Sequence, residues 1–255
     1  MKSTFNFSRI HLLFVRYFTE NWRRDLITLA AFFIAMAVLP RLIPASSSIL
    51  TPMHFSLILF IGGIHFSAHI FHEIHRPSSG MHYLHIPASR AEKFMVNGVL
   101  TLILFPLACF FLFYSALFLG NLLEPIIPPI LNYPTIEISV LSHSPIIGKL
   151  LRNYITYHSL FFLGALIFKK HPTTKTIISM ILFSIVFGII QLCLARVLWL
   201  HMDFASLEAL REKMIQWGED MLGSRIMIYA DYLLSGIVAL FFWSVAYLKF
   251  KEKEV

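Results

Sequence analysis

Residues 87–119 read PASRAEKFMVNGVLTLILFPLACFFLFYSALFL, a short charged turn followed by a long apolar run. The part from Met95 to Leu119 contains no Asp, Glu, Lys or Arg. It is longer than the roughly 20 residues that an α-helix needs to cross a hydrocarbon core of about 30 Å. This stretch therefore predicts a transmembrane helix, and the polar turn before it predicts where that helix begins.

Apolar runs of this kind recur along the whole chain. They are Leu26–Ile43, Met53–His72, Met95–Leu119, Asn153–Phe168, Thr176–Leu200 and Ile228–Leu248. The chain is 57% hydrophobic and only 14% charged, with a mean hydropathy of +0.72. A soluble chain of this length buries at most about three quarters of its surface, so lipid has to cover the rest. The sequence predicts an all-α integral membrane protein with six transmembrane helices, forming a single transmembrane domain over residues 1–255.

The charged residues fall unevenly on the two sides of these predicted helices. With the N-terminus in the cytoplasm, the inner segments hold 14 of the 21 Lys and Arg residues but 6 of the 14 acidic residues. Membrane proteins retain Lys and Arg on the cytoplasmic side, so the pattern predicts that both termini are cytoplasmic and that the protein lies in the inner (cytoplasmic) membrane. The basic pI near 9.5 has the same origin. Because no basic stripe or recognition motif stands apart from the loops, nucleic acid is not an expected partner.

Two segments have the spacing of amphipathic helices. Residues 1–25 place Ile10, Leu13 and Tyr17 at helical spacing beside several arginines, which predicts a helix lying in the inner interface with membrane lipid as its partner. Residues 203–222 carry apolar side chains at steps of three and four, with acidic residues on the other side. They predict a short extracytoplasmic amphipathic helix before the last span.

The inner loop between the second and third predicted spans, residues 73–94, reads EIHRPSSGMHYLHIPASRAEKF. A proline, two serines and a glycine predict a turn near its start. Ser89 followed three residues later by Glu92 is a capping box, which predicts that a new helix begins there. We expect Arg90 and Lys93 to be exposed on this element, where they could contact carboxylates of a soluble partner. A loop that only caps two helices would explain Ser89 and Glu92 equally well.

The same loop resembles the inner loop of the permease subunits of type 2 ABC transporters, and more narrowly a poorly characterised permease-like group among them. The resemblance rests on Gly80, Leu84, Pro87, Ser89, Arg90 and Glu92. It implies that the loop seats in a cleft of a separate ABC ATPase subunit and couples ATP hydrolysis to movement of the spans. It also implies an exporter with two permease halves, identical or different. Because the sequence contains no G-x-x-x-x-G-K-[ST] phosphate loop, we expect ATP hydrolysis on another chain, and neither enzymatic activity nor a cofactor on this one.

Histidines support a competing hypothesis. His65, His69, His72 and His75 follow at steps of four and three, so on one continuous helix they would form a single stripe. Imidazoles at i and i+4 can share a metal ion. This spacing leaves open an integral-membrane, histidine-ligated metalloenzyme of the desaturase, oxygenase or haem type, although a polar stripe facing another subunit would need no metal. A membrane scaffold without transport activity is a third hypothesis.

Overall fold

The computed structural model describes residues 6–42, 47–75, 80, 83, 85–123, 146–199, 212–213 and 225–253, which form helices and no strand. The elements are α1 (Phe7–Leu42), α2 (Ser47–His69), a 3-10 helix η1 (His72–His75), α4 (Arg90–Val99), a π-helical turn η2 (Leu100–Leu104), α5 (Phe105–Leu123), α6 (Ile146–Ile167), α7 (Pro172–Trp199) and α9 (Arg225–Lys253). The prediction of an all-helical chain is confirmed over these residues.

Three helical stretches are long and apolar enough to cross a membrane. They are Arg90–Leu122, Pro172–Val197 and Tyr229–Lys253, and a shorter apolar helix covers Met53–His69. The chain is therefore a multi-pass helical membrane protein. The other two predicted spans lie in α1 and α6.

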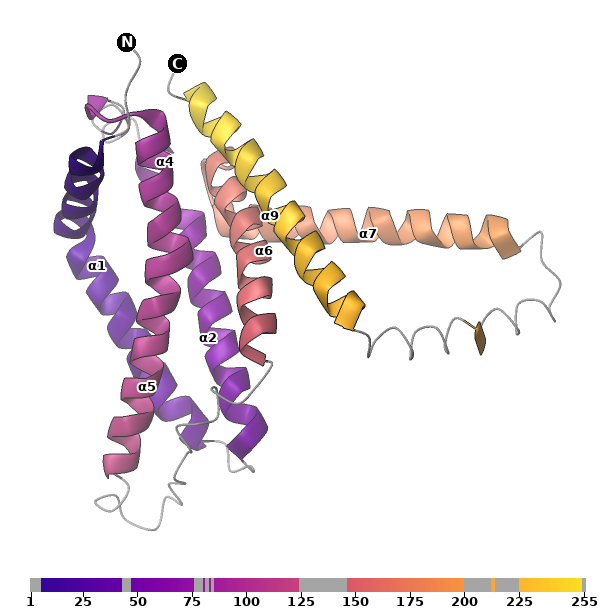
Figure 1. Ribbon diagram of the computed structural model, residues 1–255, viewed down its shortest axis with the longest axis horizontal. Helices are drawn as coiled ribbons and strands as arrows, with labels where there is room; N and C mark the ends of the chain where they lie inside the picture. The colour runs from indigo at the N-terminus through magenta and orange to yellow at the C-terminus, as the bar shows by residue number, and fades with distance from the viewer. Residues whose placement is uncertain are drawn as a thin grey trace.

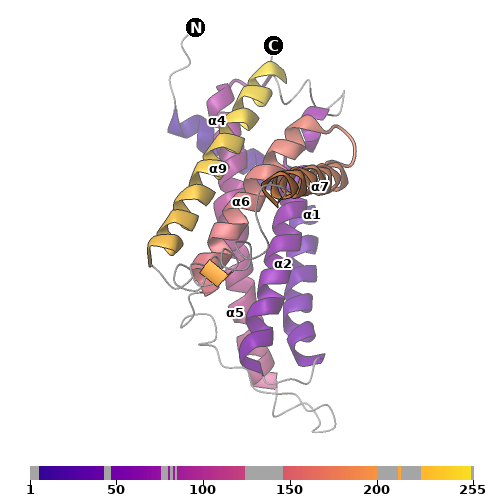
Figure 2. The same cartoon turned by 90° about the vertical axis from the view of Figure 1, so that its right-hand side faces the viewer.

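The core of the bundle lies where α1, α2, α5 and α6 run side by side (Figures 1 and 2). Each of these helices contributes a large, almost fully buried side chain to one cluster: Met36, Phe55, Phe113 and Tyr154. Phe55 and Phe113 are in direct contact, with ring centroids 4.8 Å apart. Close packing of such side chains fixes the relative positions of the helices. At one end of the bundle α1 starts, α4 starts and α9 ends (Figure 1); we call it the inner end because the sequence predicts that it faces the cytoplasm.

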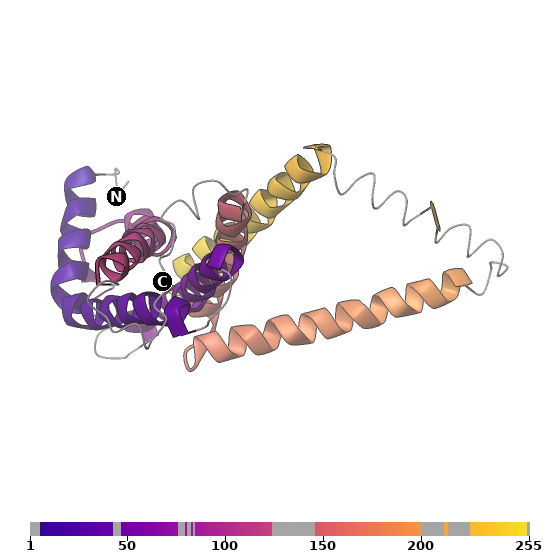
Figure 3. The same ribbon diagram turned by 90° about the horizontal axis from the view of Figure 1, so that it is seen from below.

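Helix α1 joins the predicted interfacial helix to the first predicted span without a break. Figure 3 shows it changing direction sharply between its N-terminal part and the part beside α2. Leu13 is buried against Val96 and Leu100, and Ile10 and Tyr17 pack on the same cluster, so these residues of the predicted stripe pack on the protein. A different set of apolar side chains is exposed on this part of α1: Phe7, Leu12, Val15, Phe18 and Trp22.

Helix α7 extends away from the bundle (Figures 1 and 3). None of its most apolar stretch is buried within the chain. It is held at its start, where Thr176 packs on Gly164 of α6 so closely that a Cβ at Gly164 would lie 2.0 Å from Thr176 Oγ1. The extracytoplasmic helix predicted for residues 203–222 lies outside the described residues, except that 212–213 are helical.

Replacing Gly164 by Ala should separate the start of α7 from α6. The added Cβ would also lie 3.1 Å from Thr176 Cβ, which rotation of the threonine side chain does not move, so a tight contact remains in every rotamer. We expect G164A to lower the free energy of unfolding by about 1–3 kcal/mol, measured by thermal unfolding in detergent. G188A is the matched control: no atom lies within 4 Å of its new Cβ, so helix propensity should leave it neutral or raise stability by up to about 1 kcal/mol. Equal melting temperatures for the two variants would contradict this packing.

Candidate functional site

The candidate site is the segment that joins α2 to α4 at the inner end of the bundle. Of the residues implied by the resemblance, Pro87, Ser89, Arg90 and Glu92 lie at the start of α4 or just before it, and Gly80 lies against η1. Leu84 lies outside the described residues. The described residues therefore include both ends of the loop.

The predicted capping box is confirmed, and it starts α4 at Arg90. Ser89 Oγ accepts a hydrogen bond from the backbone N–H of Glu92 at 3.2 Å. In return, Glu92 Oε2 accepts one from the backbone N–H of Ser89 at 2.6 Å. Two N–H groups that a helix start leaves unpaired are thereby satisfied.

The second oxygen of the Glu92 carboxylate joins α4 to the N-terminus. Glu92 Oε1 accepts a hydrogen bond from the backbone N–H of Asn6 at 2.8 Å. Asn6 is itself the cap of α1, since its Oδ1 accepts from the N–H of Ser8 at 2.9 Å. The Glu92 side chain is 0% exposed. One buried carboxylate therefore holds the starts of two helices, and both starts carry the partial positive charge that favours an anion.

Tyr83 is the centre of the contacts behind the cap. Its hydroxyl accepts a hydrogen bond from Asn97 Nδ2 at 3.0 Å, and Lys93 Nζ lies 5.4 Å from its ring centroid. Lys93 is only 2% exposed, so the expectation that it faces a soluble partner is wrong. The physical reason is that a cation over a tyrosine ring gains electrostatic energy while its aliphatic stem is covered by the bundle.

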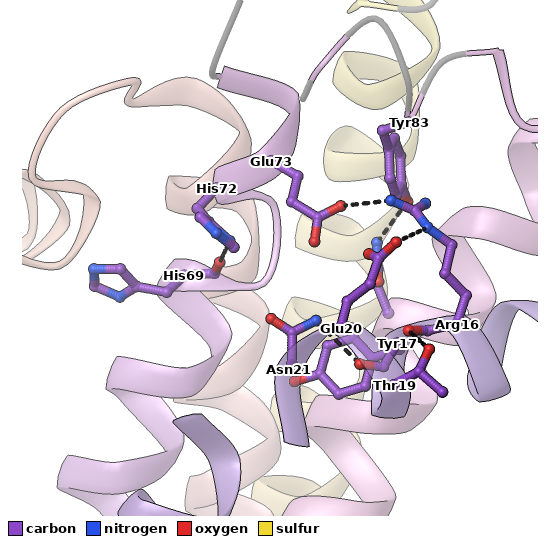
Figure 4. Close-up of polar contacts among 10 residues, drawn as sticks. Arg16, Tyr17, Thr19, Glu20, Asn21, His69, His72, Glu73 and Tyr83 are labelled. Atoms are coloured by element: carbon purple, nitrogen blue, oxygen red, sulfur yellow. Dashed lines mark hydrogen bonds and ion pairs between the residues drawn. The ribbon is translucent and has the colours of Figure 1, made fainter. Parts of the chain in front are cut away.

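Arg16 of α1 closes the same cluster from the other side (Figure 4). Its guanidinium lies 5.6 Å from the centroid of the Tyr83 ring. It also contacts two carboxylates, Glu20 at 2.8 Å and Glu73 at 3.3 Å. Because Glu73 belongs to η1, Arg16 links α1 to the end of α2 as well as to the loop. Asn6 was not singled out in the sequence, although an asparagine just before a helical apolar pattern is a capping signal.

The proline turn forms the exposed side of the loop. Gly80 is buried against η1, and a Cβ there would lie 3.1 Å from the backbone oxygen of Ile74. The chain then turns at Pro87, where the N–H of Ala88 donates to the carbonyl of Ile86 at 2.7 Å. Pro87 is exposed and Arg90 is half-buried. Pro87 and the adjoining face of Arg90 therefore form the part of the motif that a partner could reach.

The four histidines do not form one stripe, because α2 ends at His69 and the chain tightens into η1. The His65 and His69 rings lie side by side, tilted by 30°, with centroids 4.3 Å apart. His69 Nδ1 and His72 Nδ1 lie 2.9 Å and 3.1 Å from the carbonyls of His65 and His69. His75 turns instead to α6. Among the described residues, no three His, Cys, Asp or Glu side chains are grouped so that they could hold a metal ion, so the geometry offers the metalloenzyme hypothesis no support.

His75 bridges η1, α6 and the end of α9. Its Nε2 lies 2.7 Å from the carbonyl of Ala165 and its Nδ1 lies 3.2 Å from Lys253 Nζ. The two contacts are satisfied together when Nε2 donates and Nδ1 accepts, as in a neutral imidazole. Burial lowers the pKa of His75; the hydrogen bond to Ala165 opposes this, and the charges of Lys253 and Lys169 lower the pKa further.

A second polar cluster lies in the bundle directly after α4, at the π-helical turn η2. Tyr154 donates to the carbonyl of Thr101 at 2.6 Å. His158 Nε2 lies 2.7 Å from Thr101 Oγ1, and Trp243 Nε1 donates to His158 Nδ1 at 3.3 Å. His158 is 2% exposed. The only sign of this cluster in the sequence was a histidine inside a predicted span. The cluster joins η2 to α6 and α9.

Comparisons with known proteins give no match for this chain. No protein-family model, no curated protein and no solved structure is similar to it. The resemblance of the loop motif therefore rests on the sequence alone.

Replacing Glu92 by Ala should remove the Glu92 half of the capping box and the link to Asn6. Hydrogen bonds to a charged group are worth about 1.5–3 kcal/mol each, and water that enters the space left by the side chain can replace part of them. We therefore expect E92A to lower the free energy of unfolding by about 2 kcal/mol, measured as a lower thermal midpoint. E252A is the matched control, because the exposed pair of Glu252 with Lys249 is worth less than about 1 kcal/mol. Equal losses in the two variants would contradict the role given to Glu92.

The lowered pKa of His75 predicts a pH dependence of stability. The unfolded chain takes up a proton near the usual pKa of 6.5, whereas the folded chain resists it. The contribution of His75 is therefore present above pH 6.5 and is lost as the pH falls below that value. We expect the thermal midpoint to decrease less between pH 7 and pH 5 in H75N than in the unsubstituted protein. H11N, at an exposed position on α1, should keep the full dependence; parallel curves for all three proteins would refute the prediction.

Proposed function

We propose that this protein is the membrane-embedded permease subunit of an ATP-driven ABC-type exporter and works with a separate ATPase. In this proposal the segment 73–94 is the coupling loop, the membrane is the inner membrane, and the chain crosses it six times with both termini in the cytoplasm. The partner is required because this sequence has no phosphate loop of its own.

The observation that carries the proposal is the attachment of Glu73, Tyr83 and Glu92, the described residues of the loop that make these contacts, to the helices behind it. The Glu92 carboxylate ties the start of α4 to the start of α1. Arg16 and Tyr83 add contacts to η1 and α4. A loop that only covered two helix ends would need the Ser89 cap but not the link to Asn6. Attachment on several sides allows a push on the loop to move helices instead of deforming the loop.

The path continues from α4 into the membrane part of the chain. Only the ten residues Arg90–Val99 separate the proline turn from the π-helical turn η2. Through Thr101, η2 contacts Tyr154 and His158, and His158 contacts Trp243 of α9. π-helical turns occur often at functional sites in helices. Movement of α4 would therefore reach α6 and α9 through hydrogen bonds that are already in place.

The exposed apolar surface of helix α7 is an argument for a second permease half in the complex. Its apolar side chains have no cover within the described part of the chain, so lipid or another subunit has to cover them. A second half, identical or different, would place two coupling loops beside two ATPases.

Reversing the charge of Arg90 should weaken the association with the ATPase. We expect cross-linking and affinity purification from native membranes to recover a chain with a phosphate loop together with this protein. In R90E the recovery should fall by about fivefold or more, the effect expected when a charge pair at an interface is reversed. K170E is the matched control, since Lys170 is an exposed basic residue on another loop predicted to be cytoplasmic, and its recovery should be unchanged.

The proposal fails if no such chain is recovered from cells that express this protein at its normal level. It also fails if R90E and K170E recover the ATPase equally well. Thermal unfolding of both variants shows whether either substitution has damaged the fold.

A further inference from the structure

Three basic side chains come together at the inner end of the bundle, where α6 and α9 both end (Figures 1 and 2). They are His75 of η1, Lys169 just after α6 and Lys253 at the end of α9, and we call them the basic cluster. His75 Nδ1 lies 3.2 Å from Lys253 Nζ. The charges of Lys253 and Lys169 both lower the pKa of His75. The three groups belong to elements far apart in the sequence, so it is the fold that brings them together.

The basic cluster lies at the end of a buried apolar cluster. Phe71, Ala165 and Phe250 belong to that apolar cluster, and each is at most 1% exposed. The rings of Phe71 and Phe250 have centroids 5.6 Å apart. Each of the three buried residues is followed by one basic residue three or four positions later, the spacing at which side chains share a face of a helix. Packing of the apolar cluster therefore holds the basic groups at one place.

The described part of the chain gives this basic cluster no carboxylate partner. None of its ion pairs involves Lys169 or Lys253, and Glu252, next to Lys253 in the sequence, pairs with Lys249 at 2.5 Å. Lys253 donates one of its three N–H groups to His75 Nδ1. The charges of Lys169 and Lys253 repel each other. The helix dipole explains a lysine at the end of α9, but it does not explain why Lys169 and His75 approach the same place from other elements.

The position of the basic cluster fits the phosphate layer of a membrane. Ile167 and Leu248 are the last large apolar side chains exposed on α6 and α9, so lipid chains have to reach that level. Lys253 follows Leu248 by five residues of helix, a rise of roughly 7–8 Å. The headgroup layer on each side of a bilayer is roughly 5–8 Å thick. A lipid at this position would cover the apolar side chains with its acyl chains and place its phosphate at the lysines.

We propose that the basic cluster binds the phosphate of an anionic membrane lipid. Lys169 and Lys253 provide the positive charge, and His75 orients Lys253. Basic groups beside membrane-spanning helices attract anionic lipid heads, and here a bound phosphate would offset the repulsion between the two lysines. The inference does not depend on an ATPase or on transport.

Native mass spectrometry of the purified full chain with added lipid tests this site. The probes are dioleoyl phosphatidylglycerol and dioleoyl phosphatidylcholine, which have the same acyl chains and differ in the net charge of the head. We expect the first phosphatidylglycerol to bind at least about fivefold more tightly than the first phosphatidylcholine. A large excess of glycerol phosphate, a soluble phosphate without acyl chains, should leave this lipid bound. Its displacement would assign the site to a soluble anion and overturn the proposal.

Substitutions locate the lipid at the basic cluster. K169Q and K253Q should each reduce the preference for phosphatidylglycerol about fivefold, whereas K253R keeps the charge and should keep the preference. K251Q is the matched control: Lys251 is exposed at the same end of α9, but two residues along a helix it does not face the same way as Lys253. Thermal unfolding of each variant in detergent shows whether its fold is intact.

Three results would each contradict the lipid site. They are equal binding of the two lipids by the unsubstituted protein, equal effects of K251Q and K253Q, and loss of the preference in K253R. The Lys169 position gives a second test that does not disturb the hydrogen bond between Lys253 and His75.

Discussion

A buried carboxylate that accepts hydrogen bonds from two helix starts is the constraint on which the inner end of this protein depends. Removing a carboxylate from water is costly unless its oxygens are paired. Glu92 meets this requirement with the backbone N–H groups of Asn6 and Ser89. Each of these residues caps a helix, so satisfying one side chain also fixes where α1 and α4 begin. The N-terminus, the loop and the third predicted span thus share a single point of attachment.

The other features of the inner end are arranged around that point. Arg16, Tyr83 and Lys93 fill the space between α1 and the loop, and His75 attaches η1 to α6 and to the end of α9. Beyond α4, the π-helical turn η2 meets His158 and Trp243. A displacement of the proline turn would therefore be shared by several helices, which is the mechanical property that the proposed coupling role requires.

Local patterns in the sequence predicted the helices and the start of α4, because apolar period and capping chemistry act within a few residues. The link from Glu92 to Asn6 could not be predicted, since its partners are 86 residues apart. The prediction that Lys93 is exposed was wrong, because the burial of Lys93 depends on where the loop places Tyr83. The prediction that four histidines share one helix face was wrong, because α2 ends at His69 and a 3-10 helix follows. No local pattern in the sequence marks this change.

Amide hydrogen exchange at Asn6 tests the central claim most directly. Its N–H precedes α1 and has no acceptor within that helix, so protection there reports the Glu92 carboxylate alone. We predict that this amide is protected in the unsubstituted protein and exchanges about tenfold faster or more in E92A, as expected for the loss of a hydrogen bond to a charged group. The amides in the middle of α1 should be unaffected. Equal exchange at Asn6 in the two proteins would contradict the claim that Glu92 joins the loop to the N-terminus.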